Sequence, residues 1–379
     1  MAVISELKSK YQASEIVFVG SKGGVEEKLI PQADIRTLTI RSGKFRRYHR
    51  SNILNIIDPT TIFKNARDFK NFIFGIFDSL KILKEEDPDI LFLKGGYVSL
   101  PLGIACRLKG YPYFIHESDV IPGLANRILL KKAQKIFVSY PKENFPEIDE
   151  EKLVYSGNPV RKDLLEGDRK KAYEIFDMSK GLKTILVMGG SQGAHVINEL
   201  ISEKLNSYLE KYQLIHISGD YDYDWLDFKS KKSPNKNRYK LTSFLTSELK
   251  EAYALADLVI SRAGNNVLVE IAAMSKPAII IPLESSANDH QLANAKAFSR
   301  EGAAYVMLQS HLEGSKLFKQ VDRLLNDKEE MLYLSEKVHY FYKEDAAEII
   351  ADTLINFYKD TMKEEGESSA KQKAENKTD

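Results

Sequence analysis

Short apolar runs rich in β-branched residues alternate with longer amphipathic stretches along the whole chain. This alternation is typical of a parallel sheet whose strands are joined by crossover helices. In the first half, strands are predicted at 16–19, 35–40, 90–93, 113–115 and 136–138. In the second half, they are predicted at 184–188, 214–217, 238–241, 258–260, 278–281 and 304–306. Several end in glycine-rich turns, and open parallel sheets bind their ligands at such carboxyl ends.

This succession of strands predicts an α/β protein of two tandem Rossmann-like domains. Glycine and proline at 156–160 mark the expected linker, which gives domains at 1–157 and 158–343. Segment 364–379 is rich in Glu, Lys and Ser, lacks apolar periodicity and is expected to be a disordered tail. A doubly wound domain normally begins with a strand and a glycine turn. This chain instead begins with an expected helix at 2–11. The first domain is therefore expected to lack its first strand, either because it is atypical or because upstream residues are missing.

Composition narrows the class of protein. The chain has 379 residues, a formal net charge of +1, 43% hydrophobic residues and one cysteine. These values are typical of a soluble globular protein, exclude an internal disulfide and give no argument for nucleic-acid binding. A signal-peptide layout and a run of about 18 apolar residues are both absent, so a cytoplasmic location is expected. The basic, aromatic-containing run at 41–50 is either a solvated loop or a contact for anionic lipid or pyrophosphate.

The clearest candidate for chemistry is the glycine turn at 189–194, Gly-Gly-Ser-Gln-Gly-Ala, which joins a strand to a helix. Backbone N–H groups of such a turn bind phosphate, and Ser191 adds a hydroxyl donor. The lysine of an ATP-hydrolysing P-loop and the G-x-G-x-x-G spacing of a dinucleotide site are both missing. The alternative is a tight turn that only requires small residues.

In two further segments of the second half, polar side chains follow directly after a predicted strand. Arg262 and the backbone after Gly264 can meet phosphate oxygens, and Glu270 can accept both hydroxyls of a ribose. Such a glutamate also serves as a charge partner of a helix N-terminus. Asp289, Gln291 and Asn294 are spaced to lie near one face of a helix start, where they suit sugar hydroxyls or simple helix capping.

In the first half, polar segments at 94–99 and 116–123 both follow predicted strands. The second brings His116, Glu117 and Asp119 to one strand end, a source of acid–base chemistry, with a structural histidine as the alternative. The acidic run at 220–224, Asp-Tyr-Asp-Tyr-Asp, is similar to a metal-holding D-x-D element, but its polar surroundings favour a solvated loop.

Together these motifs resemble the MurG family, which transfers N-acetylglucosamine from UDP-GlcNAc to undecaprenyl-pyrophosphoryl-MurNAc-pentapeptide (lipid I) and so makes lipid II. Eight segments in order carry the resemblance: GSKGGVEEKLI, SGKFRRY, PDILFLKGGYVSLP, IHESDVIPGLANRI, GNPVR, VMGGSQGA, DLVISRAGNNVLVEIA and DHQLANA. The resemblance implies the two-domain GT-B fold. It assigns the lipid acceptor and the membrane to the first domain, the UDP-sugar to the second, and a returning helix at about 346–360.

The resemblance also implies roles for individual residues, by comparison with the family. The donor pyrophosphate would lie at Gly190, Ser191 and Gln192, with Arg161 close by. The uracil would be held by the backbone at Phe244 and Leu245, the ribose by Glu270, and the GlcNAc hydroxyls by Gln291 and Asn294. The remaining donor-binding candidates are Arg262, Gly264 and Asn265, and the acceptor-binding candidates are Lys94, Gly95, Gly96 and Tyr97.

By resemblance, the reaction is a metal-independent inversion that needs no obligatory cofactor. The expected location is peripheral, on the inner face of the cell membrane, where Ile62, Phe63, Phe69, Phe72, Phe74 and Phe77 beside the basic run are candidates for lipid contact. Cell-wall synthesis proteins are candidate partners, and the resemblance links the protein to cell shape and cell division.

The chain departs from the family pattern in three places. Asn is commoner where this chain has Asp119, Thr is often found in place of Val267, and the N-terminal T-G-G-T-G-G-H-type loop with its proposed base has no counterpart. Either the chain is a fragment of a longer gene product, or its base comes from His116, Glu117 or Asp119. Two alternatives to a GlcNAc transferase remain: an inactive UDP-sugar-binding or membrane-recruiting protein, and a UDP-sugar epimerase.

Overall fold

The computed structural model describes residues 1–11, 14–22, 35–43, 59–190, 193–284, 286 and 289–375, without the side chains of 59–64 and 365–375. The chain forms two compact units, called here the first and the second unit. The first unit comprises 1–118, 122–157 and 345–379, and the second comprises 119–121 and 158–344.

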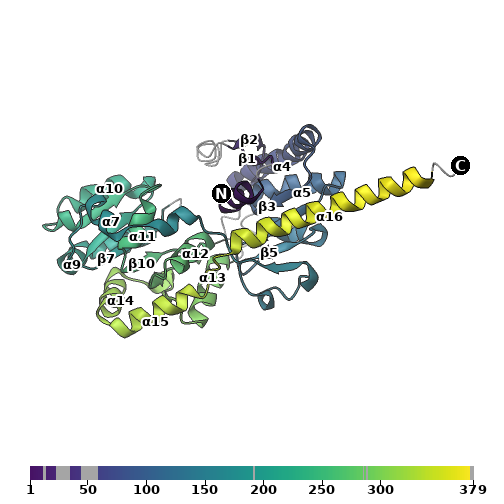
Figure 1. Cartoon of the computed structure of the whole chain (residues 1–379). Coiled ribbons are helices and arrows are strands. Elements are labelled where there is room, and N and C mark those ends of the chain that lie inside the picture. Colours follow the sequence, from purple (N-terminus) through teal and green to yellow (C-terminus); the bar gives the residue numbers. More distant parts are fainter. Residues whose placement is uncertain are drawn as a thin grey trace. The chain divides into compact units, whose positions relative to one another are not determined.

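The second unit is built on a six-stranded parallel sheet (Figure 1), in the order β12-β11-β10-β7-β8-β9. The strands are β7 Thr184–Met188, β8 Gln213–Ile217, β9 Tyr239–Thr242, β10 Leu258–Ser261, β11 Ala278–Ile280 and β12 Tyr305–Val306. From β7 the chain builds outward first through β8 and β9, then on the other side through β10, β11 and β12. The order therefore reverses between β7 and β10, and at such a switch point the crevice outside the carboxyl ends of the strands binds ligands.

Helices complete the second unit because its strands are apolar on both faces and need cover on both. They are α7 Arg169–Ile175, α8 His195–Glu203, α9 Leu205–Lys211, α10 Asp220–Ser230, α11 Leu249–Leu255, α12 Asn265–Ala273, α13 His290–Arg300, α14 Gly314–Asn326 and α15 Lys328–His339. In α14, Leu317, Val321 and Leu324 recur at helical spacing and are fully buried, facing the core that Ile197 and Ile201 of α8 enter. Short 3-10 helices lie at Lys162–Glu166, Lys236–Arg238 and Gln309–His311.

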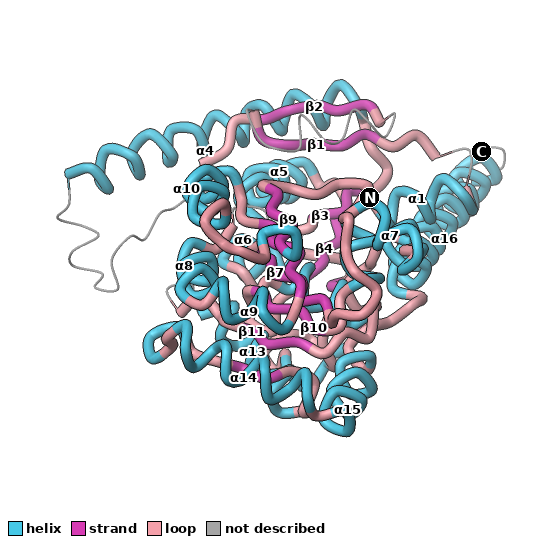
Figure 2. The backbone as a smooth tube through the Cα atoms, turned by 90° about the vertical axis from the view of Figure 1, so that its left-hand side faces the viewer, coloured by secondary structure: helices cyan, strands magenta, loops and turns pink. Residues whose placement is uncertain are grey.

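The first unit contains two parallel sheets in the part of the chain that is described, β1 paired with β2 and a separate sheet β3-β4-β5-β6. Its strands are β1 Val17–Ser21, β2 Arg36–Ile40, β3 Leu91–Leu93, β4 Tyr113–Glu117, β5 Ile136–Val138 and β6 Leu153–Tyr155. Its helices are α1 Ala2–Lys10, α4 Pro59–Glu86, α5 Gly96–Lys109, α6 Leu124–Leu129 and α16 Ala346–Glu375, with 3-10 turns at Leu130–Lys132, Lys142–Asn144 and Glu150–Lys152. Figure 2 shows β1 and β2 side by side along α4. The sheet of this domain is thus divided rather than continuous.

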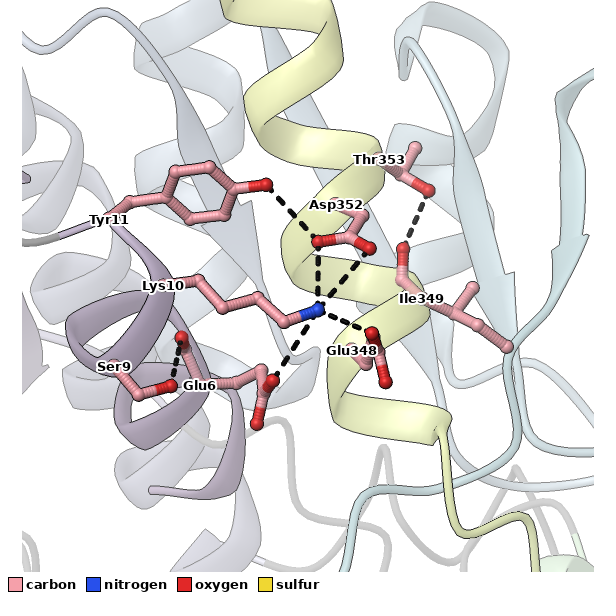
Figure 3. Close-up of polar contacts among 8 residues, drawn as sticks. All are labelled: Glu6, Ser9, Lys10, Tyr11, Glu348, Ile349, Asp352 and Thr353. Carbon is pink, nitrogen blue, oxygen red and sulfur yellow. Dashed lines mark hydrogen bonds and ion pairs between the residues drawn. The ribbon is translucent and has the colours of Figure 1, made fainter.

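Helix α16, yellow in Figure 1, returns to the first unit and packs beside α1. Ile350 and Leu354 are buried against Phe114 and Phe137 of the sheet, together with Val3 of α1. At the rim of this apolar contact, Lys10 donates to Glu348 and Asp352, and the Tyr11 hydroxyl donates to Asp352 over 3.2 Å (Figure 3). The apolar contact provides most of the stabilisation, because exposed ion pairs contribute little.

Every predicted strand is confirmed to within two residues, and β4 runs two residues past its predicted end, so that it includes His116 and Glu117. Strand β6 at Leu153–Tyr155 was not predicted. The predicted disordered tail is wrong for 364–375, because α16 runs on to Glu375, and 376–379 lie outside the described residues. The tail is rich in Lys, Glu, Ala and Gln, which are strong helix formers. A helix without an apolar face gains no packing against a core, but it can still form.

The predicted solvated loop at 220–224 is also wrong, because these residues are the first turns of α10. Gly219, with φ 77°, turns the chain into the helix, and Asp220 and Asp222 occupy its first turn. Carboxylates are stabilised there by the helix dipole, so the acidic run is a helix start signal. No helix of the described residues is long and apolar enough to cross a membrane.

Candidate functional site

The carboxyl end of β7 opens into the glycine turn that precedes α8. Gly190 has φ 84°, and no described residue lies within 4 Å of the position of a Cβ there. Gly193 has φ 74°, and a Cβ there would lie 2.4 Å from the Ser218 carbonyl oxygen. Within the described part of the chain, no side chain caps the N-terminus of α8, whose N-cap is Ala194. Ser191 and Gln192, expected at the pyrophosphate, lie outside the described residues.

The neighbouring strand β10 ends in a second open turn. Gly264 is the N-cap of α12, no side chain caps this helix, and nothing lies within 4 Å of the position of a Cβ. Asn265, the first residue of α12, is buried. Because β7 and β10 are adjacent and parallel, two uncapped helix N-termini meet at one edge of the sheet. Such an edge attracts anions.

Arg262 is placed differently from the expectation that it meets phosphate. Its guanidinium is mostly buried and donates to the Ile281 carbonyl oxygen over 3.2 Å. Burial lowers the pKa of Arg262 from its usual value. In this geometry the side chain fastens the end of β10 to the loop that follows β11.

Glu270 lies on α12, about one and a half turns after the start of the helix. Its carboxylate accepts a hydrogen bond from the Tyr253 hydroxyl over 3.0 Å. Burial raises the pKa of Glu270, against the lowering effects of Tyr253 and of the Arg161 charge. A carboxyl group whose pKa is raised by burial, next to an open edge of the sheet, is typical of a functional site.

The flanks of this edge carry the other donor candidates of the second unit. Arg161 is half exposed, with its Nε 3.5 Å from the Asp163 carboxylate. Phe244, just after β9, is 51% exposed, and its carbonyl accepts from the Thr242 hydroxyl over 2.9 Å. Leu245, which follows it, is partly buried.

Helix α13 carries Gln291 and Asn294, the two residues expected at the sugar. Asn294 is fully buried; its Nδ2 donates to Asp119 over 2.7 Å and to the Ala263 carbonyl over 3.2 Å. Its Oδ1 accepts from the Val120 N–H over 3.1 Å. Asn294 therefore binds the 119–121 segment of the second unit, and its role toward GlcNAc hydroxyls stays a prediction. Gln291 is half-buried, and its Oε1 accepts from the Leu283 N–H over 2.9 Å.

The acidic residues of α10 form a hydrogen-bonded cluster that the sequence did not suggest. Asp222 is buried and accepts from His195 Nδ1, from Asn198 and from the Trp225 indole, each over 2.7 Å. The bond to Asp222 raises the pKa of His195, the first residue of α8. The described residues contain no group of side chains suited to holding a metal ion. Asp222 thus ties the first turn of α10 to that of α8.

In the first unit, β3 and β4 are adjacent and carry the acceptor candidates at their carboxyl ends. Lys94 is exposed, Gly95 and Gly96 both have positive φ, and Tyr97 is half-buried in the first turn of α5. His116 and Glu117, which end β4, are buried, with 0% and 3% of their surface exposed.

The three predicted acid–base residues have different hydrogen-bond partners. Glu117 accepts from the Gly123 N–H over 2.9 Å and from Asn126 over 2.8 Å, while Asp119 belongs to the second unit. Asn126 itself was not predicted as a functional residue. Its buried Oδ1 has no hydrogen-bond partner, and its amide lies against Gly95. No pattern around it could reveal this, because an asparagine in a helix is usually solvated.

Comparison with known proteins identifies the class. The models of the glycosyltransferase family 28 N-terminal and C-terminal domains match residues 1–138 and 184–353. The chain is 37% identical over 330 residues to UDP-N-acetylglucosamine–N-acetylmuramyl-(pentapeptide) pyrophosphoryl-undecaprenol N-acetylglucosamine transferase 2 of Bacillus anthracis, covering 87% of this chain and 88% of that protein. It is 35% identical over 329 residues to the Clostridium botulinum (strain Langeland) transferase, covering 86% and 87%.

Solved structures agree on the fold. MurG of Acinetobacter baumannii matches with a TM-score of 0.67 at 24% identity, covering 94% of each chain. The UDP-GlcNAc 2-epimerase of Neisseria meningitidis matches with a TM-score of 0.65 at 14% identity, covering 94% of this chain and 95% of that one.

Fold and site together define a hexosyltransferase of two Rossmann-like domains with the GT-B architecture. Within that class, the chain belongs to the MurG family.

Proposed function

We propose that the protein transfers GlcNAc from UDP-GlcNAc to the MurNAc 4-hydroxyl of lipid I, giving lipid II for peptidoglycan synthesis. The observation that supports this most is the edge of the second unit's sheet, where two uncapped helix N-termini lie beside the Glu270 carboxylate. Helix N-termini suit a diphosphate, and a carboxylate suits ribose hydroxyls. The same helix ends can stabilise the UDP that leaves when the acceptor hydroxyl attacks C1 with inversion. This chemistry needs no metal.

The acceptor hydroxyl must lose a proton in this reaction. Of the three predicted acid–base residues, Asp119 is the one with a solvent-accessible carboxylate, 31% exposed. We therefore assign it the role of general base in the proposal. An asparagine at this position is isosteric and still accepts the bond from Asn294, so the local structure is retained.

The deciding experiment measures transfer of radiolabelled GlcNAc from UDP-GlcNAc to lipid I in detergent micelles. We expect lipid II from the unmodified protein, and a kcat lowered by about 100-fold or more in Asp119→Asn, as general bases contribute. The matched control is Asp360→Asn on the exposed surface of α16. Absence of lipid II, or hydrolysis or epimerisation of the donor without acceptor, would contradict the proposed function, whereas an unchanged kcat in Asp119→Asn would contradict only the base assignment.

We also propose that helix α4 of the first unit docks on the inner face of the cell membrane. Phe69, Ile73 and Phe77 recur at i, i+4 and i+8, and Phe69 and Phe77 are 53% and 61% exposed. Arg41 lies over the Phe74 ring, 4.4 Å from its centroid, and Lys70 lies 5.8 Å from it. An apolar stripe with a cationic rim is suited to an anionic lipid surface. Phe72 is half-buried, and the side chains of Ile62 and Phe63 and residues 44–50 lie outside the described part.

Vesicle binding tests this docking. The double variant Phe69→Ser, Phe77→Ser is expected to lose most co-sedimentation with vesicles of phosphatidylglycerol, because each buried aromatic ring contributes about 1.5–3 kcal/mol. Phe228→Ser, which removes a similarly exposed ring from α10 of the second unit, is the matched control and should bind normally. If the double variant bound vesicles as well as the unmodified protein does, the membrane contact would lie elsewhere.

A further inference from the structure

His290, the first residue of α13, faces the Asp119 carboxylate within the second unit. The imidazole Nδ1 lies 3.6 Å from Asp119 Oδ2, and the His290 side chain is 16% exposed. This Nδ1 is buried and makes no hydrogen bond to the part of the chain that the structure describes. The proposed function leaves this histidine without a role.

The other oxygen of the same carboxylate is held by the same helix. Asp119 Oδ1 accepts a hydrogen bond from Asn294 Nδ2 over 2.7 Å, and Asn294 Oδ1 in turn accepts from the Val120 N–H over 3.1 Å. His290 and Asn294 are four positions apart on α13, so their side chains lie on one face of the helix. Helix α13 therefore directs two nitrogen atoms at the two oxygens of one carboxylate.

The chemistry of the two groups determines where the ring proton lies. A carboxylate only accepts hydrogen bonds, so the ring nitrogen that faces Asp119 carries the proton. A buried donor without a partner costs roughly 1–3 kcal/mol, and such an atom in a native structure calls for an explanation. Catalytic hydrogen bonds are often long in unliganded enzymes and shorten when substrate binds, which accounts for a contact of 3.6 Å.

We propose that His290 is the positioning residue of the general base, and that its Nδ1–H fixes the orientation of the Asp119 carboxylate and stabilises its ionised form. This inference rests on the proposed function, in which Asp119 takes the acceptor proton. In that step the proton of the acceptor O4–H moves to the carboxylate and O4 forms a bond to C1 of the donor sugar. The bond from C1 to the diphosphate oxygen breaks, and UDP leaves with the electron pair. His290 touches none of the reacting atoms and acts through Asp119.

The first test measures steady-state kinetics of lipid II formation. His290→Leu is expected to lower kcat roughly 10-fold or more, the value of one hydrogen bond to a charged group, and to change KM for either substrate little. His290→Asn keeps an N–H donor near the position of Nδ1 and should restore part of kcat. His311→Leu, on the exposed 3-10 turn Gln309–His311, is the matched control and should be fully active. Binding of UDP, which lacks the sugar, shows that each variant is folded.

A double-mutant cycle tests whether the histidine acts through the carboxylate. In an Asp119→Asn background, His290→Leu is expected to cause no further loss of kcat, because the hydrogen bond that it removes no longer supports a base. Two side chains that contribute separately would instead give losses that multiply.

A measurement on the unliganded protein tests the pair independently of activity. Long-range proton–nitrogen NMR spectra of the imidazole show which ring nitrogen carries the proton. In the unmodified protein the proton of His290 is expected on Nδ1. In Asp119→Asn it is expected to move to Nε2, because the hydrogen-bond partner of the ring sets its tautomer.

Several results would overturn this inference. A proton on Nε2 in the unmodified protein would show that the pair is not formed, and an unchanged kcat in His290→Leu would show that it has no part in the reaction. Multiplying losses in the cycle, or a raised KM with a normal kcat, would assign His290 a role separate from the base. A protein with its proton on Nδ1 that makes no lipid II would refute the proposed function and leave the pair of His290 and Asp119 in place.

Discussion

Replacing Glu270 with alanine is expected to weaken UDP-GlcNAc binding about 100-fold without unfolding the protein. Two hydrogen bonds from ribose hydroxyls to one carboxylate, each worth about 1.5–3 kcal/mol when charged, give a loss of at least this size. The carboxylate already accepts from the buried Tyr253 hydroxyl, which holds it at the open edge of the sheet.

The unliganded protein is expected to tolerate this change. Burial raises the pKa of Glu270, so its ionised form is disfavoured by folding. A raised carboxyl pKa contributes stability below the usual glutamate range and costs stability above it, so Glu270→Gln should unfold at the same or a higher urea concentration at neutral pH. Its affinity for UDP-GlcNAc should still fall, since the amide offers one acceptor oxygen and no charge.

The pH dependence gives a second signature. UDP-GlcNAc binding requires the ionised carboxylate, so affinity is expected to decline as the pH falls, beginning above the range in which an ordinary glutamate titrates. Titration calorimetry between pH 5 and 8 would measure it. Glu329→Ala, on the exposed start of α15, is the matched control for the substitution. If Glu270→Ala kept full affinity, the ribose would have to bind elsewhere.

Gly193→Ala is expected to cost about 2–5 kcal/mol of the free energy of unfolding and to abolish donor binding. The residue has φ 74°, which disfavours any side chain, and its Cβ would lie 2.4 Å from the Ser218 carbonyl oxygen. That oxygen belongs to the backbone leading into α10 and also accepts from Asn198, so it cannot move aside easily. The glycine turn at 189–194 must therefore move away from the Ser218 backbone. This movement shifts the N-terminus of α8 away from the bound donor.

Gly190→Ala in the same turn is the matched control. It has φ 84°, but no described residue lies within 4 Å of the position of a Cβ. The variant should therefore lose only about 1–2 kcal/mol of the free energy of unfolding, the strain of holding an alanine at a positive φ. Urea denaturation of both variants measures the difference in the free energy of unfolding. Equal destabilisation of the two variants would show that the contact with Ser218 carries no cost.

The sequence was most informative where a strand is followed by a small-residue turn. Strand β7 and its glycine turn were predictable because an apolar run stops at residues that can hold no side chain. The place of Glu270 on α12 was predictable because it lies six residues after the glycine of the turn that opens the helix. The acidic run at 220–224 was misinterpreted, because polar residues at a helix start and in a loop have the same composition.

Contacts between distant segments decided the rest. Asn294 and Asp119 are 175 positions apart, and only the folded unit shows that they bind each other. The same holds for Asp222 with His195 and for Lys94 with His116.

What the sequence by itself determined is therefore the order of strands, the turns at their carboxyl ends and the family, because these depend on local spacing along the chain. What only the tertiary structure decided is which polar side chains are already used by the protein and which remain for a ligand. Burial and hydrogen bonding between segments set that difference, and no local pattern encodes them.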